Sequence, residues 1–395
     1  MQCLFQCILS LSKCYRNRCC VHLYRQDTDE ETLPQTVEQP AASDNTPAEG
    51  ASSINSEADA LINELTAQLT IHRSEIAQLQ SKLAEMEIKT ACLSRQCVAF
   101  DTVSKNDKLV AHLTGLPTGG VFSIILQLCQ RFDIQYCLGW RVETISPTDQ
   151  LFITLRKLRT NVSLKVLAWE YKVSDTTITN IVVTWLHVLW EILVNGMMNK
   201  LPSRQRNSQC LPQAFATFTN CRAVVDCTEI WCAIPKQFAM QSMTYSHYKH
   251  YHTLKGLVAV APNAVITYVS ELYPGSTSDK AIMQHCGIID QLEVGDMILA
   301  DKGFLISDIL PTGVSVNIPP FLNTSQFSRE QCILTRNIAR ARIHVERANA
   351  RMKRFKILDF IPHNYRDISS KIFQVCAALV NFQNPLLSET ESLLI

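Results

Sequence analysis

The spacing of apolar residues changes along the chain and marks out its segments. From Ile62 to Met86 apolar positions recur alternately three and four residues apart, the spacing that aligns them on one seam of a coiled coil. His72 falls on that seam, where a polar residue costs stability and sets register. We therefore predict a short coiled coil over residues 58–90 that joins two copies of the chain. The alternative is an amphipathic helix that packs on its own protein.

A helical pattern returns over residues 105–200. Ser146-Pro147 begins one helix, residues 161–163 break it, residues 164–171 form a second helix, and Ser174 caps a third after a tight turn. Two short helices joined by a tight turn are typical of a helix-turn-helix. Polar residues interrupt the apolar stretch that follows, which indicates a packed helix and no membrane span.

In the helix-turn-helix interpretation the third helix faces a DNA major groove. Its candidate contacts are Thr176, Thr177 and Asn180. The third helix lacks Arg and Lys, so a plain helical subdomain that packs Trp169, Trp185 and Trp190 stays open as the alternative.

Residues 220–385 alternate between β-branched runs and helical stretches. The pattern predicts strands at Cys221–Ile230 and Met297–Ala300, a hairpin of His252–Ala261 and Ala264–Tyr273, and a helix at Ser278–Leu292. This order predicts an α/β domain with a mixed sheet flanked by helices. A strand that follows the first crossover helix lies beside strand one, so Asp301 is expected next to Asp226 at their C-terminal ends.

Three carboxylates have surroundings that suit a metal. Asp226 and Asp301 follow apolar, β-branched runs, and Glu346 lies in a basic helix. A carboxylate at the end of a buried strand costs free energy unless something binds it. Three carboxylates from distant parts of the chain make an all-oxygen site that suits Mg²⁺ or Mn²⁺.

Four stretches occur in the order that resembles the catalytic core of a DDE transposase of the PIF/Harbinger type. This core is known in animal genes as a DDE superfamily endonuclease domain, sometimes preceded by a THAP zinc finger. The stretches are residues 226–230, 275–280, 299–304 and 342–347. The resemblance implies an RNase H-like α/β catalytic domain, preceded by an all-α helix-turn-helix subdomain. It also implies that Asp226, Asp301 and Glu346 are the catalytic residues and ligands of Mg²⁺ or Mn²⁺.

The helix around Glu346 adds a second resemblance and a charge pattern. Bacterial insertion-sequence transposases carry a Tyr-x-x-Arg-x-x-x-Glu-x-x-x-x-x-x-Lys pattern that Arg342, Glu346 and Lys353 fit, while Ala339 replaces the tyrosine. At about 100° per residue, these three matching residues share one helix face. A basic helix beside a metal site suits a polyphosphate substrate. The candidate DNA contacts in this domain are Arg342, Arg347, Arg351, Lys353, Arg354 and, from the aromatic and basic run 245–252, Lys249.

A fourth carboxylate and a basic cluster each have two interpretations. Asp279 either serves the N-terminus of the helix that follows it, which we favour, or joins the metal ligands. Residues 351–356 resemble a nuclear localisation cluster, and DNA contact explains the same residues. We predict a nuclear protein.

The N-terminal quarter carries less information. Residues 1–25 are rich in cysteine, and Cys19-x-x-His22 is similar to the closing pair of a THAP finger, but the opening pair is not at the required distance. We leave this segment unassigned. Residues 26–57 are acidic and poor in large apolar groups, so we predict a disordered linker. The 16 cysteines, with no convincing secretory signal, indicate reduced thiols.

The prediction for function is a metal-dependent DNA endonuclease that cleaves and joins phosphodiesters. The resemblance also implies a separate accessory DNA-binding protein as a partner. Two alternatives stay open: a domesticated DNA-binding or scaffold protein that keeps the fold without cleavage, and a nuclease unconnected with transposition.

Overall fold

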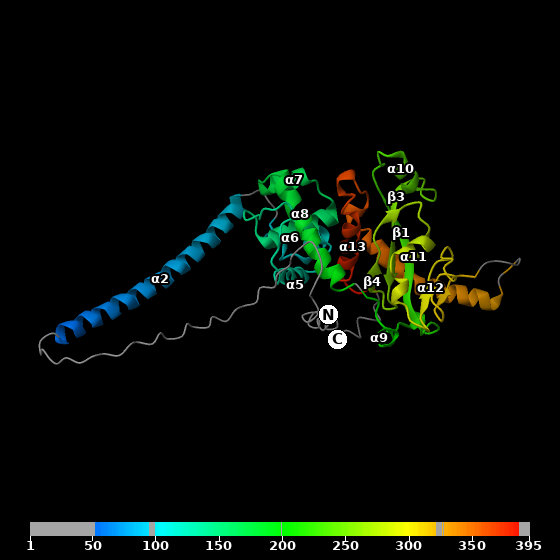
Figure 1. Cartoon of the computed structure of the whole chain (residues 1–395), viewed down its shortest axis with the longest axis horizontal. Helices are drawn as coiled ribbons and strands as arrows, with labels where there is room; N and C mark the ends of the chain where they lie inside the picture. The colour runs from blue at the N-terminus through cyan, green and yellow to red at the C-terminus, as the bar shows by residue number, and fades with distance from the viewer. Residues whose placement is uncertain (1–51, 95–98, 199, 321–325, 327, 387–395) are drawn as a thin grey trace, which may run out of the picture. The chain divides into compact units, whose positions relative to one another are not determined.

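The computed structural model describes residues 52–94, 99–198, 200–320, 326 and 328–386. The predictions for residues 1–25, and for residues 26–51 of the linker, lie outside this part of the chain. The described residues fall into two units. One contains α2 (Ser52–Ser94), and the other contains the helices and the sheet that follow (Figure 1). Each unit is described by itself.

The first unit is dominated by α2, a single helix of 43 residues. The seam residues Ile62, Leu69, Leu79 and Met86 are all exposed on it. The helix begins at Ser52, inside the segment that the sequence predicted to be a disordered linker, so that boundary was wrong. No Gly or Pro interrupts residues 52–57, and lengthening an existing helix costs far less than starting one.

The second unit begins with a helical region of six α-helices. They are α3 (Phe100–Val103), α4 (Asp107–Thr114), α5 (Gly119–Cys129), α6 (Pro147–Thr160), α7 (Leu164–Tyr171) and α8 (Asp175–Leu189). The sequence signals for the last three are confirmed. The Ser146 side chain accepts a hydrogen bond from the Asp149 amide, α6 ends at Asn161 in the left-handed conformation, and the Ser174 side chain caps α8 at Thr177.

A π-helix, η2 (Trp190–Asn195), continues α8. The joined segment Asp175–Asn195 is long and apolar enough to cross a bilayer, but 61% of its apolar window is buried inside the protein. It packs against α6 and α13, and Trp185 is fully buried while Trp169 is exposed. This degree of burial is typical of a helix in the core of a folded domain.

A mixed sheet follows, and it confirms the predicted α/β class. Its strands are β1 (Cys221–Trp231), β2 (Tyr245–Ser246), β3 (Tyr251–Val260), β4 (Ile266–Val269), β5 (Tyr273–Pro274), β6 (Met297–Leu299) and β7 (Ser315–Asn317). The order is β2-β3-β1-β6-β7, and β4 and β5 also pair with β3. β1 is antiparallel to β3 and parallel to β6.

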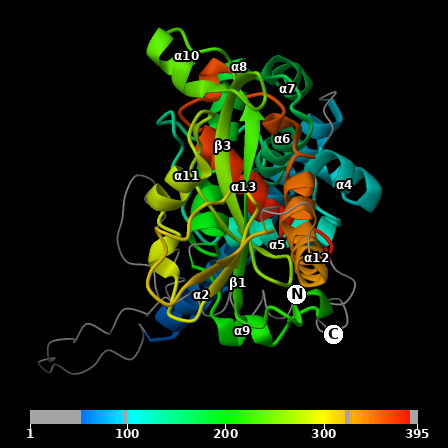
Figure 2. The same cartoon turned by 90° about the vertical axis from the view of Figure 1, so that its right-hand side faces the viewer.

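Helices flank both faces of this sheet. They are α9 (Arg204–Ser208), α10 (Phe238–Thr244), α11 (Asp279–His285), α12 (Arg329–Met352) and α13 (Ser369–Val380), with short 3-10 turns η3 (Gln213–Phe215), η4 (Ile289–Gln291), η5 (Lys356–Leu358) and η6 (His363–Tyr365). α11 and α12 lie on opposite sides of the central strands (Figure 2).

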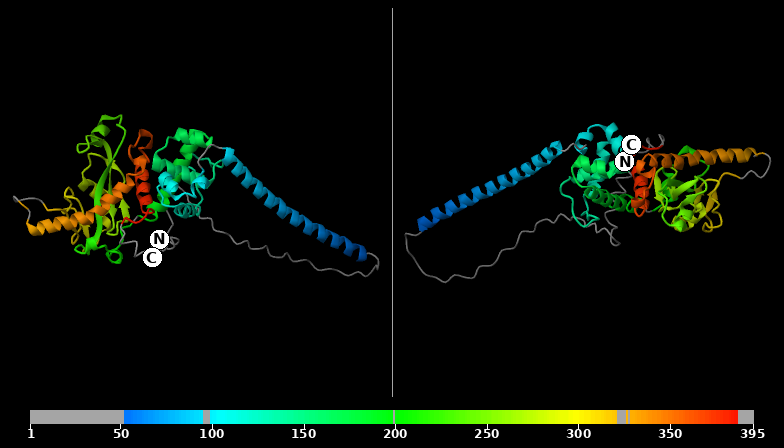
Figure 3. Two further views of the ribbon diagram at one scale, coloured as in Figure 1. Left: turned by 180° about the vertical axis from the view of Figure 1, so that it is seen from behind. Right: turned by 90° about the horizontal axis from the view of Figure 1, so that it is seen from above.

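α13 joins the helical region to the sheet, since it contacts η2, α12 and β4 and lies between them (Figure 3). The indole of Trp190 donates to Gln374 Oε1 at 2.6 Å. The helical region and the sheet are therefore packed together.

Two predicted boundaries in this domain were wrong. The helix expected over residues 278–292 ends at His285, because Gly287 adopts a positive φ of 80° that stops a helix. The second hairpin strand, expected over residues 264–273, is divided into β4 and β5. Ser270, between them, exchanges hydrogen bonds with the Leu257 backbone through both its amide and its hydroxyl.

Candidate active site

The register of β1 and β6 places two aspartates side by side. Val224 pairs with Leu299 across the parallel strands, and Asp226 and Asp301 each follow two residues later. Alternate residues of a strand point to opposite faces. Val225 and Ala300 both lie in the core cluster on the α11 side of the sheet. Asp226 and Asp301 therefore project to the other face, toward α12.

Asp226 lies inside β1, in agreement with the strand predicted over Cys221–Ile230. β1 continues to Trp231, because its second half pairs with β3 as far as Thr253. Only the first half of β1 is paired with β6. Asp226 thus lies just past the last residue of β1 that pairs with β6, and Asp301 follows the end of β6.

α12 brings the third carboxylate and an arginine to this point. A capping box formed by Ser328 and Gln331 begins the helix. The Arg342 guanidinium lies 3.1 Å from Asp301 Oδ1 and 3.6 Å from Glu346 Oε1. Its side chain is 13% exposed, against 52% for Asp301 and 56% for Glu346. Arg342 was predicted to face phosphate, but here it neutralises two carboxylates of the protein.

Sequence reasoning missed Asn349, which contacts Asp226 directly. Its Nδ2 donates to Asp226 Oδ2 at 2.8 Å. Asn349 lies seven residues after Arg342 and three after Glu346, on the same helix face. That spacing was visible in the sequence, but an asparagine in a basic helix gives no separate signal of its own.

The surroundings of Asp226 perturb its acidity. Burial raises the pKa of Asp226 to about 6, while Arg342 and the bond from Asn349 act in the opposite direction. The nearby carboxylates of Asp301 and Asp279 raise it further. A perturbed carboxylic acid beside a second carboxylate is a common property of active sites.

The fourth carboxylate, Asp279, belongs to a different interaction. Its Oδ1 lies 2.8 Å from Lys255 Nζ. Lys255 shares a strand face with Leu257, which lies in the core cluster on the α11 side. The N-cap of α11 is the side chain of Ser278, so Asp279 is a first-turn acid and not the cap itself. This placement removes Asp279 from the group of carboxylates that face α12.

Comparison with protein families identifies two regions of the chain. Residues 225–381 match the model of the DDE superfamily endonuclease, and residues 144–194 match that of the helix-turn-helix of DDE superfamily endonuclease. The chain carries a DDE superfamily endonuclease domain preceded by a transposase helix-turn-helix. No curated protein and no solved structure matches the chain.

The DDE domain has basic side chains beside the three carboxylates. Lys353 ends α12 as its C-cap residue. Desolvation and the Lys249 ammonium lower the pKa of Lys353, and the carboxylates of Asp226 and Glu229 oppose this. Lys249 and Lys353 therefore lie within electrostatic reach of the site. Arg347 and Arg354 are exposed.

Arg351, in contrast, is partly engaged within the DDE domain. Its guanidinium donates to the backbone carbonyls of Asn384 and Pro385. A phosphate contact from Arg351 would compete with these bonds.

The predicted contacts in the helix-turn-helix separate into two kinds. Thr176 is exposed, and the Thr177 hydroxyl lies 2.9 Å from Ser174 Oγ at the start of α8. Asn180 is fully buried. Its Nδ2 donates to the Trp140 carbonyl at 3.0 Å, and its Oδ1 accepts from the Leu138 amide. Asn180 was predicted to read DNA, but its amide is occupied by the loop before α6 and does not reach the surface.

The donor set fits a hard divalent cation in chemical type. Within the described residues no three His, Cys, Asp or Glu side chains form a ready metal cluster, since Arg342 lies between Asp301 and Glu346. The two aspartates and the glutamate nevertheless offer only oxygen to a cation. Asp226, Asp301 and Glu346 are the residues that would hold Mg²⁺ or Mn²⁺.

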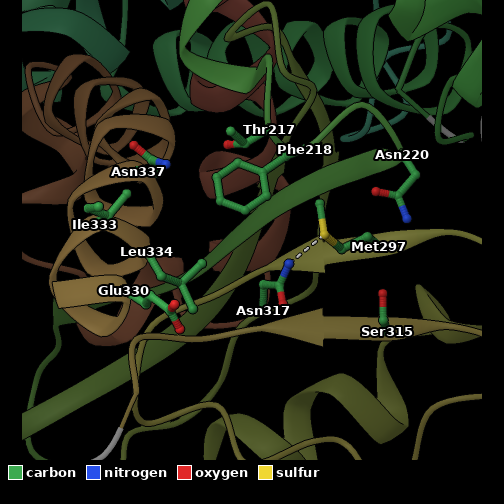
Figure 4. A pocket seen from close by; sticks show the side chains of 10 residues that line it. All are labelled: Thr217, Phe218, Asn220, Met297, Ser315, Asn317, Glu330, Ile333, Leu334 and Asn337. Carbon is green, nitrogen blue, oxygen red and sulfur yellow. Dashed lines mark hydrogen bonds between the residues drawn. The ribbon is translucent and has the colours of Figure 1, made fainter. Parts of the chain in front are cut away.

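A hollow of about 560 Å³ lies away from this site, between α12 and the β6–β7 edge (Figure 4). It is lined by Thr217, Phe218, Asn220, Met297, Ser315, Asn317, Glu330, Ile333, Leu334 and Asn337. Of these ten residues Glu330 alone is ionisable. The lining offers a phosphodiester no positive charge, so the hollow is not a second candidate for the reaction.

Proposed function

We propose that the protein is a metal-dependent DNA endonuclease of the PIF/Harbinger transposase type, which cleaves and joins phosphodiesters through Asp226, Asp301 and Glu346. One observation carries the proposal. Asp226 and Asp301 stand at the same level of two parallel strands, and Arg342 of the crossing helix bonds both Asp301 and Glu346. Three distant parts of the chain, β1, the end of β6 and α12, supply these charged groups to one place, and a cluster of this kind is a common property of functional sites.

The residues have distinct tasks in this reaction. When bound, Mg²⁺ or Mn²⁺ supplies a Lewis acid for the phosphate and activates a water or a 3′-hydroxyl. Asp226 is the most buried of the three acids and is fixed by Asn349, which suits the central ligand. Glu346 and Asp301 are half exposed and lie on the DNA side. Lys353 and Lys249 bind the phosphates that flank the cut.

DNA recognition is divided between the two parts of the second unit. Thr176 and Thr177 lie in the first turn of α8, and the N-terminal residues of a recognition helix contact base edges. Arg347, Lys353 and Arg354 extend the contact along the backbone. Because the proposed substrate is DNA, we expect the protein to be located in the nucleus.

Dimerisation through α2 is the third part of the proposal. The seam is exposed from Ile62 to Met86, and an exposed apolar seam of this length is stabilised by a second helix. Two copies joined at α2 would hold two DNA ends at once.

Cleavage of labelled DNA in Mg²⁺ or Mn²⁺ tests the proposal. We expect Asp226→Ala, Asp301→Ala and Glu346→Ala each to reduce cleavage by about a thousandfold or more, as loss of catalytic groups commonly does. Asp308→Ala is the matched control, because Asp308 is an exposed acid of the same domain that pairs with Lys280. Cleavage that persists in all three variants would contradict the proposal.

The second candidate function is a DNA-binding protein without cleavage activity. It is favoured by the position of Arg342, whose guanidinium already neutralises two of the three acids. In that case the intact protein would bind the same DNA and leave it uncut with either metal.

A further inference from the structure

Asn349 lies at the centre of the face that α12 turns toward the carboxylates. Arg342, Glu346, Asn349 and Lys353 follow one another at helical spacing on that face. Asn349 is 7% exposed, so it is the most enclosed of the four. α12 thus reaches Asp301 through Arg342 and reaches Asp226 through Asn349.

The bond to Asp226 fixes which way the amide points. An ionised carboxylate only accepts hydrogen bonds, so the NH₂ group of Asn349 must face Asp226 and its Oδ1 must face elsewhere. That Oδ1 is buried, and it accepts no hydrogen bond from the described part of the chain. A buried carbonyl oxygen without a donor costs free energy and is uncommon in native proteins.

We propose that Asn349 is an oxygen ligand of the divalent cation held by Asp226. Amide oxygens are ordinary ligands of hard cations, and the cation would supply the partner that Oδ1 lacks. The Nδ2 group would at the same time hold the Asp226 carboxylate in one orientation, as groups around a metal ligand commonly do. The inference rests on the proposed function, because it adds a residue to the same metal centre.

A structural role for Asn349 would have different consequences. If the residue only ties α12 to β1, its loss lowers stability equally with and without metal and leaves the affinity for metal unchanged. If it is a ligand, the loss is seen in the affinity for metal itself. The measurement must therefore be metal binding, and it needs no DNA and no turnover.

The experiment titrates Mn²⁺ into the full-length protein by calorimetry, and compares melting temperatures in EDTA and in Mn²⁺. We expect Asn349→Ala to raise the Kd for Mn²⁺ by about tenfold or more. Asn337→Ala, the same change on the same helix but far from the carboxylates, should leave the Kd unchanged. Asn349→Asp keeps an oxygen ligand, so it should bind Mn²⁺ at least as tightly as the intact protein.

Asn349→Asp also separates the two roles by stability. Two carboxylates then face each other, so the melting temperature in EDTA should fall and Mn²⁺ should restore it. This variant decides the question even if Asn349→Ala does not fold. A Kd for Asn349→Ala within about twofold of the intact protein, or weaker Mn²⁺ binding by Asn349→Asp, would overturn the inference.

Asp226→Ala distinguishes this inference from the proposed function. If Asp226→Ala abolishes Mn²⁺ binding while Asn349→Ala does not weaken it, only the role of Asn349 is overturned. If the intact protein binds Mn²⁺ no better than Asp226→Ala does, the metal centre itself fails, and both proposals fall with it.

Discussion

Arg342 is the residue that most changes the view of the candidate site given by the sequence. Its spacing from Glu346 and Lys353 predicted a side chain that grips phosphate. The structure instead places its guanidinium against Asp301 and Glu346. A positive charge held between two acids offsets the repulsion between them, and it competes with any cation that binds them.

Arg342→Met should therefore have opposite effects on stability and on metal binding. In EDTA we expect the free energy of unfolding to fall by about 1–2 kcal/mol, since both partners of Arg342 are half exposed and the pairs are only partly desolvated. The affinity for Mn²⁺ should rise severalfold, because the competing charge is gone. Chemical denaturation and calorimetry measure the two effects. A weaker affinity for Mn²⁺ in the variant would show that Arg342 assists metal binding instead.

At the level of secondary-structure elements, α8 carries both exposed side chains and side chains that hold the fold together. Its first two turns were expected to carry three DNA contacts, Thr176, Thr177 and Asn180. Thr176 is exposed there, but Asn180, one turn later, is fully buried and bonds the backbone of Leu138 and Trp140. The sequence does not show whether Asn180 is exposed or buried, because the loop that covers it comes from a distant part of the chain.

Substitutions in α8 should therefore affect DNA binding at the exposed position and stability at the buried one. Thr176→Glu should weaken DNA binding by about tenfold or more, because it adds negative charge beside phosphates, and should leave the melting temperature unchanged. Asn180→Ala should lower the free energy of unfolding by about 1 kcal/mol, because the part-buried backbone groups of Leu138 and Trp140 lose their hydrogen-bond partner. Fluorescence anisotropy with labelled duplex DNA and thermal melting give the two readouts.

The opposite result would be informative for the helix-turn-helix. If Thr176→Glu bound DNA as well as the intact protein, α8 would not lie against DNA. The plain helical subdomain, with Trp185 in its core, would then be the better interpretation of residues 144–194.

At the level of the whole molecule, α2 and the remainder of the chain form separate units. The helix buries none of its seam, and Leu69 and Leu79 are exposed on it. An isolated helix in water gains little stability from its own hydrogen bonds, so a partner for the seam is the simplest source of order. We infer that the oligomeric state depends on α2 and that the fold of the second unit does not.

The double substitution Leu69→Lys and Leu79→Lys should convert a dimer to a monomer. Charge at two seam positions removes apolar contact and adds repulsion between the copies. Analytical ultracentrifugation measures the change, and Gln68→Lys, an exposed change beside the seam, is the control. The thermal transition of the second unit should stay where it is. A monomeric intact protein would contradict the proposal.

Local signals in the sequence were enough to define many of the elements. Ser146, Asn161 and Ser174 mark the ends of helices, because capping depends on neighbouring backbone groups alone. The β-branched runs before Asp226 and Asp301 gave two of the strands, and their order along the chain gave the α/β class. Boundaries failed where contacts from elsewhere in the fold decided them: the strand expected over residues 264–273 is divided into β4 and β5, because Ser270 between them bonds the Leu257 backbone.

The sequence by itself determined the acidic residues, their order, and the strands and helix that carry them, since periodicity and motif spacing are properties of the chain alone. Only the tertiary structure decided what each side chain meets. It paired Arg342 with two acids, joined Asn349 to Asp226, separated Asp279 from the other carboxylates through Lys255, and buried Asn180. These contacts join residues far apart in the sequence, so they depend on packing and on strand register.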